Sequence, residues 1–413
     1  MGDDLQDIVD DLAERLQRSV AIDDPSIRLL AASRHFGDED GIRVASVLNR
    51  TLDADVREKI LAQGIARWTA PGRVLAPVAE ARSRLCLPVR CSGLLLGFLW
   101  LIDADRPLSE QQQERASDAA DRAGVVLYHR LVVHERTKAR HEAILWELVS
   151  ADPAIRTQAV DDLRAEQLYP AGAMRFQVLG VQHPGLDAAT APQYAALEAA
   201  AGDACQPPAY TLMAANKARA WLLLVRREPL SPAELGALCA RLTARFDRLT
   251  GDGGQLVFGA GAVVDQVEQV VDSYRQAFLA GRAARLVPSL GPLARWGALG
   301  PYELLLRMPA DDLLAAARTP VLDALEREGG PTLVTTLEQF LDNAGDVART
   351  AQELTIHRAT LYHRLKRIEQ LTGCVLNRGE DRLTLHLGLK MRALAAGYRS
   401  ENAAEPPRMR SVS

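Results

Sequence analysis

One stretch decides how the C-terminal part of this chain folds: TLVTTLEQFLDNAGDVARTAQELTIHRATLYHRLKRIEQLTG, residues 332–373. Its first apolar residues recur every three or four positions, which predicts an amphipathic helix, and Asn343-Ala344-Gly345 ends that helix. Asp346 follows in the position of an N-cap, which predicts a short second helix. A third helix comes a few residues later, and two short helices joined by a tight turn form a helix-turn-helix unit.

The third helix of this stretch has an apolar face and an opposite face that suits DNA. We expect Thr355 to cap this helix. Its apolar stripe is Leu361, Leu365 and Ile368. The opposite face holds a small residue, hydrogen-bond donors and cations, which fits insertion into a major groove. The predicted DNA contacts are Arg358, Ala359, Tyr362 and His363 near base edges, Arg349, Thr350, Lys366 and Arg367 near phosphates, and Thr360 in the same turns.

The charge distribution favours nucleic-acid contact at this place and not over the whole chain. The 413 residues have a net charge of −4, which gives no sign of binding to nucleic acid. Residues 356–368, by contrast, hold four cationic side chains and no acid. A local basic surface is all that a DNA-binding domain needs. A basic helix face that meets only solvent is the alternative.

The composition predicts a globular cytoplasmic protein with more than one domain. Hydrophobic residues make up 48% and charged residues 25% of the chain, which is ordinary for a globular protein. No run approaches the roughly 20 apolar residues of a membrane span, and the N-terminus lacks the pattern of a secretion signal. The five cysteines are scattered without CxxC spacing, so we expect reduced thiols and no zinc site.

The N-terminal part has the pattern of a small α/β sensor domain, residues 1–130. Apolar residues at helical spacing predict a helix over residues 5–18, and two strand-like runs follow at 19–24 and 28–33. Residues 84–103 hold two apolar runs separated by Ser92-Gly93, which predicts a β-hairpin.

A second α/β domain is predicted over residues 172–290. Four strand-like runs, at 176–181, 209–213, 218–225 and 256–261, alternate with helical patterns at 194–201, 232–248 and 264–285.

The remaining segments are predicted to be helical or disordered. A helical linker, residues 131–171, belongs to a longer strand-free stretch whose small-residue seam packs on its own domain or on a second copy. A helical connector covers residues 291–330, ending at Gly329-Gly330-Pro331, and the DNA-binding domain covers 331–395. We expect the tail, residues 396–413, to be disordered.

The segment VARTAQELTIHRATLYHRLKRIEQLTG also resembles the C-terminal domain of PucR/CdaR-type bacterial regulators, whose signature is close to LxxHxxTLxYRLxRIexLTG. The matching residues are Leu354, His357, Arg358, Thr360, Leu361, Arg364, Leu365, Arg367, Ile368, Leu371, Thr372 and Gly373. One departure is Ala359, where the family often has Asn. That change removes a side-chain hydrogen bond and allows a methyl contact to thymine, so we expect an operator sequence of the protein's own.

The resemblance extends upstream and implies both a fold and a function. Residues 176–285, with VFGAGAVV and SYRQAFLAGRAAR, are similar to a degenerate GGDEF-like domain, and the N-terminal part looks like a GAF- or PAS-type sensor. The implied fold is multidomain α/β plus all-α. The implied function is transcriptional regulation, in which a dimer or higher oligomer binds double-stranded operator DNA and responds to an unidentified small-molecule effector. The alternative is a degenerate signalling protein or scaffold without sequence-specific DNA binding.

An enzymatic function is not expected, although domains of the GGDEF type include cyclases. Nucleotide cyclisation needs a glycine-rich turn for phosphate and adjacent carboxylates for a metal ion. The turn between the predicted strands 209–213 and 218–225 is Ala214-Ala215-Asn216-Lys217, which has neither. The histidines at 129, 134 and 141 lack the spacing of metal ligands on one helix face. We therefore predict no catalytic residues, no cofactor and no metal.

Overall fold

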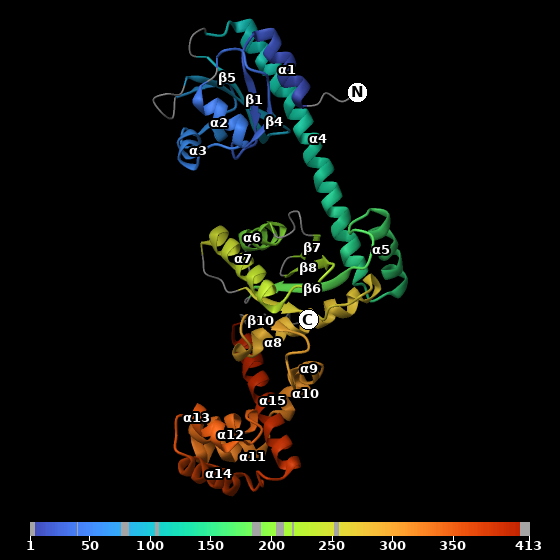
Figure 1. Cartoon of the computed structure of the whole chain (residues 1–413), viewed down its shortest axis with the longest axis vertical. Helices are drawn as coiled ribbons and strands as arrows, with labels where there is room; N and C mark the ends of the chain where they lie inside the picture. Colours follow the sequence, from blue (N-terminus) through green and yellow to red (C-terminus); the bar gives the residue numbers. More distant parts are fainter. Residues whose placement is uncertain are drawn as a thin grey trace, which may run out of the picture. The chain divides into compact units, whose positions relative to one another are not determined.

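The computed structural model describes residues 5–38, 40–75, 82–103, 107–183, 191–203, 210–216, 219–251 and 256–404. It divides into two compact units, residues 1–139 and 140–413. Along the chain, Figure 1 shows an α/β domain in blue, a second in green and yellow, and a helical domain in orange and red. The predicted fold class, multidomain α/β plus all-α, is confirmed. None of the helices described is long and apolar enough to cross a membrane.

The first unit contains a five-stranded antiparallel sheet in the order β2-β1-β5-β4-β3. The predicted helix, strand pair and hairpin are all present. At the hairpin turn, Ser92 and Gly93 have φ angles of 51° and 80°, the left-handed conformations that a two-residue hairpin turn needs. The elements are α1 (Leu5–Leu16), β1 (Val20–Asp23), β2 (Leu29–Ala32), α2 (Gly41–Asn49), α3 (Ala54–Leu61), η1 (Ile65–Arg67), β3 (Gly72–Val74), β4 (Arg84–Cys91) and β5 (Leu94–Ile102), followed by α4 (Glu110–Leu148).

The two faces of this sheet have separate cores, because side chains alternate along each strand. Val20 and Ile22 of β1 pack with the apolar stripe of α1 and the alanines of α4. Ala21 of the same strand packs on the other side with Phe98 and Trp100 of β5 and with residues of α3 and η1. The second face carries the cavity described below.

The helix α4 contributes to both units. Alanines of its first half pack in the core of the first unit, whereas Ile144 and Leu145 pack in the core of the second. Asp152 caps α5 (Pro153–Ala165), which packs in the same second core. The predicted linker is therefore partly an element of the second α/β domain, and the alanine seam packs on its own domain.

The second unit begins with a five-stranded sheet in the order β10-β9-β6-β8-β7, in which β10 pairs parallel to β9 and the other pairs are antiparallel. The helices α6 and α7 cover one face, and α8 with α5 and the end of α4 covers the other. The predicted strands are present, and β10 is an addition of three residues. The elements are β6 (Arg175–Gln182), α6 (Ala191–Asp203), β7 (Thr211–Asn216), β8 (Arg219–Arg226), α7 (Pro232–Thr250), β9 (Val257–Ala260), η2 (Val267–Gln269), α8 (Val270–Leu286), η3 (Pro288–Leu290) and β10 (Leu293–Arg295).

The C-terminal helical domain shares its core with the end of the predicted connector. Leu322 of α11 and Leu325 of η4 pack in the same core as the helices that follow. Gly329-Gly330-Pro331 does not interrupt the helical path, because Pro331 lies in the first turn of α12, where its missing N–H has no intrahelical partner. The elements are α9 (Tyr302–Leu305), α10 (Ala310–Ala316), α11 (Pro320–Ala324), η4 (Leu325–Gly329), α12 (Gly330–Asp342), α13 (Val347–Glu353), α14 (Arg358–Thr372) and α15 (Gly379–Ala404).

The last helix corrects the prediction of a disordered tail from residue 396. The helix α15 continues to Ala404, and residues 405–413 lie outside the described residues. Leu389 packs in the core of the C-terminal domain, whereas Leu394 packs with α8 in a neighbouring core. Gly397 permits this contact, since an added Cβ would lie 2.4 Å from the carbonyl oxygen of Leu286.

Candidate DNA interface

The helix-turn-helix unit consists of α13, a short turn and α14, and a side chain caps each helix. Asp346 accepts hydrogen bonds from the backbone N–H groups of Ala348 (2.8 Å) and Arg349 (3.0 Å), as predicted. These bonds, the one from Arg349 first, lower the pKa of the Asp346 carboxyl. The predicted cap Thr355 is wrong. Thr355 lies in the turn with a φ of 56°, and His357 caps α14 by accepting from the N–H of Ala359 (3.2 Å).

The apolar stripe of α14 fixes its orientation. Leu361 and Ile368 are fully buried and Leu365 nearly so. They pack with Leu337 and Phe340 of α12 and with residues of α13 and α15. The stripe was predicted from the sequence and is confirmed. Because this stripe is buried, the opposite face of α14 is exposed to solvent.

That opposite face carries the predicted contacts. The exposed side chains are Arg358, Ala359, Thr360, Tyr362, His363, Lys366 and Arg367. Tyr362 is 60% exposed. The first acid after this basic run, Glu369, accepts the N–H of Leu376 (2.8 Å) near the C-terminal end of the helix. The face is therefore cationic and rich in donors over its first three turns.

Of the two predicted contacts on α13, one is exposed and one is not. Arg349 is exposed, with its Nε donating to Glu353 (3.0 Å) on the same helix. Thr350 is fully buried, and its hydroxyl donates to the carbonyl oxygen of Asp346 (2.6 Å). The predicted phosphate contact of Thr350 is therefore wrong, because α12 covers this side of α13.

Thr350 belongs instead to a polar cluster that the sequence analysis missed. The buried side chain of Asn343 donates to the Thr350 hydroxyl (3.3 Å) and to the Glu353 carboxylate (2.7 Å). The hydrogen bond from the Asn343 side chain is the main reason that the pKa of the Glu353 carboxyl is lowered. These bonds join the end of α12 to α13. A polar Asn directly after an apolar helix was the available sign of this role.

Arg364 is a second residue whose role was missed. It matches the family signature but is half-buried, and its Nη1 donates to the Thr336 hydroxyl of α12 (3.2 Å). It holds α14 against α12 and does not belong to the exposed face.

The turn of the second domain at which a cyclase would need glycines and acids is only partly described. Ala214, Ala215 and Asn216 end β7 and pair with β8, while Lys217 lies outside the described residues. In the described part of the chain, no three His, Cys, Asp or Glu side chains come together in a way that could hold a metal ion.

Comparison with protein families gives two matches. The model of the PucR C-terminal helix-turn-helix domain matches residues 333–391. The model of a GGDEF-like domain matches residues 156–283. The first match contains α13, α14 and the whole exposed face.

Two curated relatives and one solved structure are also similar to this chain. The DNA-binding transcriptional activator AdeR of Bacillus subtilis (strain 168) is 22% identical over 410 residues, 94% of this chain and 93% of that protein. The purine catabolism regulatory protein of the same organism is 28% identical over 155 residues, 37% of this chain and 28% of that protein. A regulator of polyketide synthase expression from Bifidobacterium adolescentis covers 59% of this chain and 94% of its own at 18% identity, with a TM-score of 0.27.

Proposed function

We propose, from the premise that this chain is a DNA-binding transcriptional regulator of the PucR/CdaR type, that it binds operator DNA as a homodimer and responds to a small-molecule effector. The observation that carries the DNA-binding mode is the cationic exposed face of α14, opposite a fully packed apolar stripe. A helix in this setting can enter a major groove without exposing its core.

The side chains on this face divide by position. Arg358, Ala359, Tyr362 and His363, in the first two turns of α14, would read base edges, with Thr360 beside them. Lys366 and Arg367 would contact phosphates, and Arg349 would do the same from α13. The positive end of the α14 helix dipole adds a favourable field for a phosphate at its N-terminus.

Dimerisation follows from the small size of this surface. One short recognition helix reads few base pairs, whereas two copies related by a two-fold axis read two half-sites. The N-terminal α/β domain would act as the GAF/PAS-like sensor and the GGDEF-like domain would relay the signal. Since its target is chromosomal DNA, the protein would work in the cytoplasm.

We also infer that the GGDEF-like domain is not a cyclase. The supporting observation is that Ala214, Ala215 and Asn216 stand where glycines and acids would be needed. A nucleotide-turnover assay with GTP on the full chain tests this, and product formation would contradict it.

The test of the proposed function is a mobility-shift and fluorescence-anisotropy experiment on the full chain. The probe is the intergenic DNA upstream of its own gene, with a shuffled sequence of the same composition as control. We expect tighter binding to the intergenic DNA and a steep loss of affinity with salt. Equal affinity for both probes would contradict sequence-specific DNA binding and would favour the alternative, a signalling protein or scaffold.

A further inference from the structure

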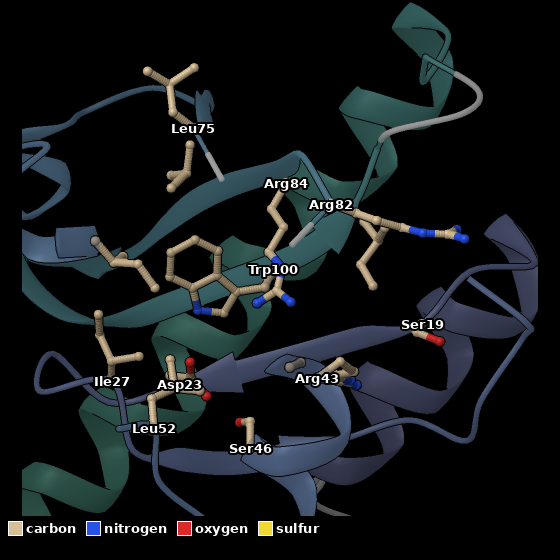
Figure 2. A pocket seen from close by; sticks show the side chains of 14 residues that line it. Ser19, Asp23, Ile27, Arg43, Ser46, Leu52, Leu75, Arg82, Arg84 and Trp100 are labelled. Carbon is tan, nitrogen blue, oxygen red and sulfur yellow. The ribbon is translucent and has the colours of Figure 1, made fainter. Parts of the chain in front are cut away.

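The first unit contains a cavity between its sheet and the helices α2 and α3, which we call the N-terminal cavity. It is lined by Asp23 of β1, Arg84 of β4, Trp100 of β5 and Arg43 of α2, and by apolar side chains that include Ile27 and Ile60. Its free volume is about 30 Å³. Figure 2 shows the indole nitrogen of Trp100 and the guanidinium of Arg84 directed toward Asp23, while Arg82 extends away.

Three buried polar atoms at this cavity make no hydrogen bond of ordinary length and angle within the described part of the chain: Asp23 Oδ1, Trp100 Nε1 and Arg84 Nε. The Trp100 indole faces the Asp23 carboxyl without a full bond, and this weak contact slightly lowers the pKa of Asp23. Asp23 is 5% exposed and Trp100 is 7% exposed, so solvent does not replace the missing bonds. Buried polar groups are nearly always paired, and exceptions call for a specific explanation.

The charges around the cavity balance when Asp23 is ionised. Arg82 also lines the cavity but extends away from it (Figure 2). Arg84 pairs with Asp40 (2.5 Å), which leaves Arg43 and Asp23 as the two charges that face the cavity without this pair. Burial raises the pKa of Asp23 to about 7, against the opposing effect of Arg43 and Arg84. A ligand that donates a hydrogen bond to Asp23 would favour the ionised form.

We propose that the N-terminal cavity is the effector site, and that its ligand is a small molecule of zero net charge with an N–H donor next to an oxygen acceptor. The donor binds Asp23 Oδ1, and the oxygen accepts from Trp100 Nε1 and Arg84 Nε. An ion of either sign would leave an unbalanced charge in a buried site. This proposal rests on the proposed function, that of an effector-responsive regulator.

The size of the cavity links binding to movement. A volume of about 30 Å³ suffices for a water molecule and not for an organic ligand. Ile60 belongs to α3 and Arg43 to α2, so these helices form the wall opposite the sheet. Ligand binding therefore moves α2 or α3 outward, and an apolar body on the ligand then contacts Ile27 and Ile60.

Isothermal titration calorimetry on the full chain tests the proposal with four probes of similar size. L-Norvaline and δ-valerolactam both have an N–H donor beside an oxygen acceptor, the first as a zwitterion and the second as a neutral amide. n-Butylamine lacks the acceptor and butyrate lacks the donor. We expect norvaline or valerolactam to bind with a Kd of about 1 mM or tighter, and at least about tenfold tighter than butylamine and butyrate.

Variants of the cavity residues test whether the probes bind there and whether the N–H donor belongs to an ammonium group or to a neutral amide. Trp100→Phe removes one donor at little cost in volume and should weaken binding about tenfold. Asp23→Asn should weaken a zwitterion about tenfold, because the ion pair between its ammonium group and the carboxylate is lost. It should weaken a neutral amide by less than about threefold, because the amide N–H can still donate to the Asn oxygen. Glu58→Gln, an exposed change on α3, should bind as the unchanged chain does. Circular dichroism verifies that each variant is folded.

Three results would overturn the proposal: no binding of norvaline or valerolactam, equal binding of butylamine or butyrate, or unchanged binding in Trp100→Phe. DNA affinity is measured on the same preparations. Failure of the probes with retained DNA selectivity would refute the effector site alone. Loss of DNA selectivity with probe binding intact would refute the proposed function alone.

Discussion

Two buried polar clusters, one in each unit, differ in whether their groups are paired. In the C-terminal domain, Asn343 donates to Thr350 and Glu353, and the Thr350 hydroxyl in turn donates to a backbone carbonyl. In the N-terminal domain, Asp23 Oδ1 and Trp100 Nε1 face one cavity and make no hydrogen bond of ordinary length and angle among the described residues.

This difference matches what each domain is proposed to do. A cluster whose bonds are all made holds neighbouring helices in one arrangement, and the first cluster holds the helix before α14. A cluster with unmade bonds costs stability until a ligand supplies them. The paired cluster thus suits a domain that presents a fixed surface, and the unpaired one suits a domain that responds.

The largest expected effect is the pH dependence of the unpaired cluster. The folded-state pKa of Asp23, about 7, lies above the unfolded value of about 3.9, so the folded state binds this proton more tightly. That stabilisation is present at low pH and is lost as the pH rises through 7.

Between pH 5 and pH 8 we expect the N-terminal domain to lose about 2–3 kcal/mol from this group, and Asp23→Asn to remove that loss. Pulse-labelling hydrogen exchange of β1 and β5 along a urea gradient measures the stability of this domain at each pH. The control Glu58→Gln should lose as much stability between pH 5 and pH 8 as the unchanged chain. A pH dependence that persists unchanged in Asp23→Asn would show that the carboxyl is not strained by burial.

The next effect concerns the paired cluster. Thr350→Val removes a hydroxyl that makes two hydrogen bonds and should destabilise the C-terminal domain by about 1–2 kcal/mol. Thr384→Val is the matched control, because its hydroxyl also donates to the carbonyl four residues earlier but is exposed. Urea unfolding compares the two. Equal losses would mean that the buried cluster has no special role.

The smallest effect is expected from a single phosphate contact on the exposed face. Lys366→Ala should lower the affinity for all DNA sequences alike and reduce the slope of log K against log salt by about one. Arg327→Ala serves as a control, since Arg327 is exposed on η4. Anisotropy titrations between 50 and 200 mM salt, about the range over which such slopes are clear, measure this change. An unaltered slope would remove Lys366 from the phosphate contacts.

The sequence predicted the parts of this molecule that depend on local patterns. Leu361, Leu365 and Ile368 repeat at helical spacing, and Ser92-Gly93 can adopt the turn of a hairpin, so both were found without a structure. The same helical spacing also predicted which face of α14 is exposed, since that face lies opposite the apolar stripe. These features depend on residues within one or two turns of each other.

The parts that were missed depend on contacts between distant segments. Thr350 is buried because α12 covers it, and α15 continues past residue 396 because α8 offers a surface to Leu394. The cap of α14 is an exception with a local cause: the turn places Thr355 in a left-handed conformation, and His357 caps the helix. The N-terminal cavity combines residues of four strands and two helices, and no motif marks such a site.

The most direct test of the account is the base preference of α14. Selection from a random DNA pool gives the operator of the unchanged chain, and anisotropy then compares single-base variants of it for Tyr362→Ala, His363→Ala and Lys366→Ala. We predict that the first two change the order of preference at particular bases, by about 1–3 kcal/mol each, while Lys366→Ala leaves the order intact. Uniform weakening by all three, with no change of order, would contradict the claim that this face reads DNA sequence.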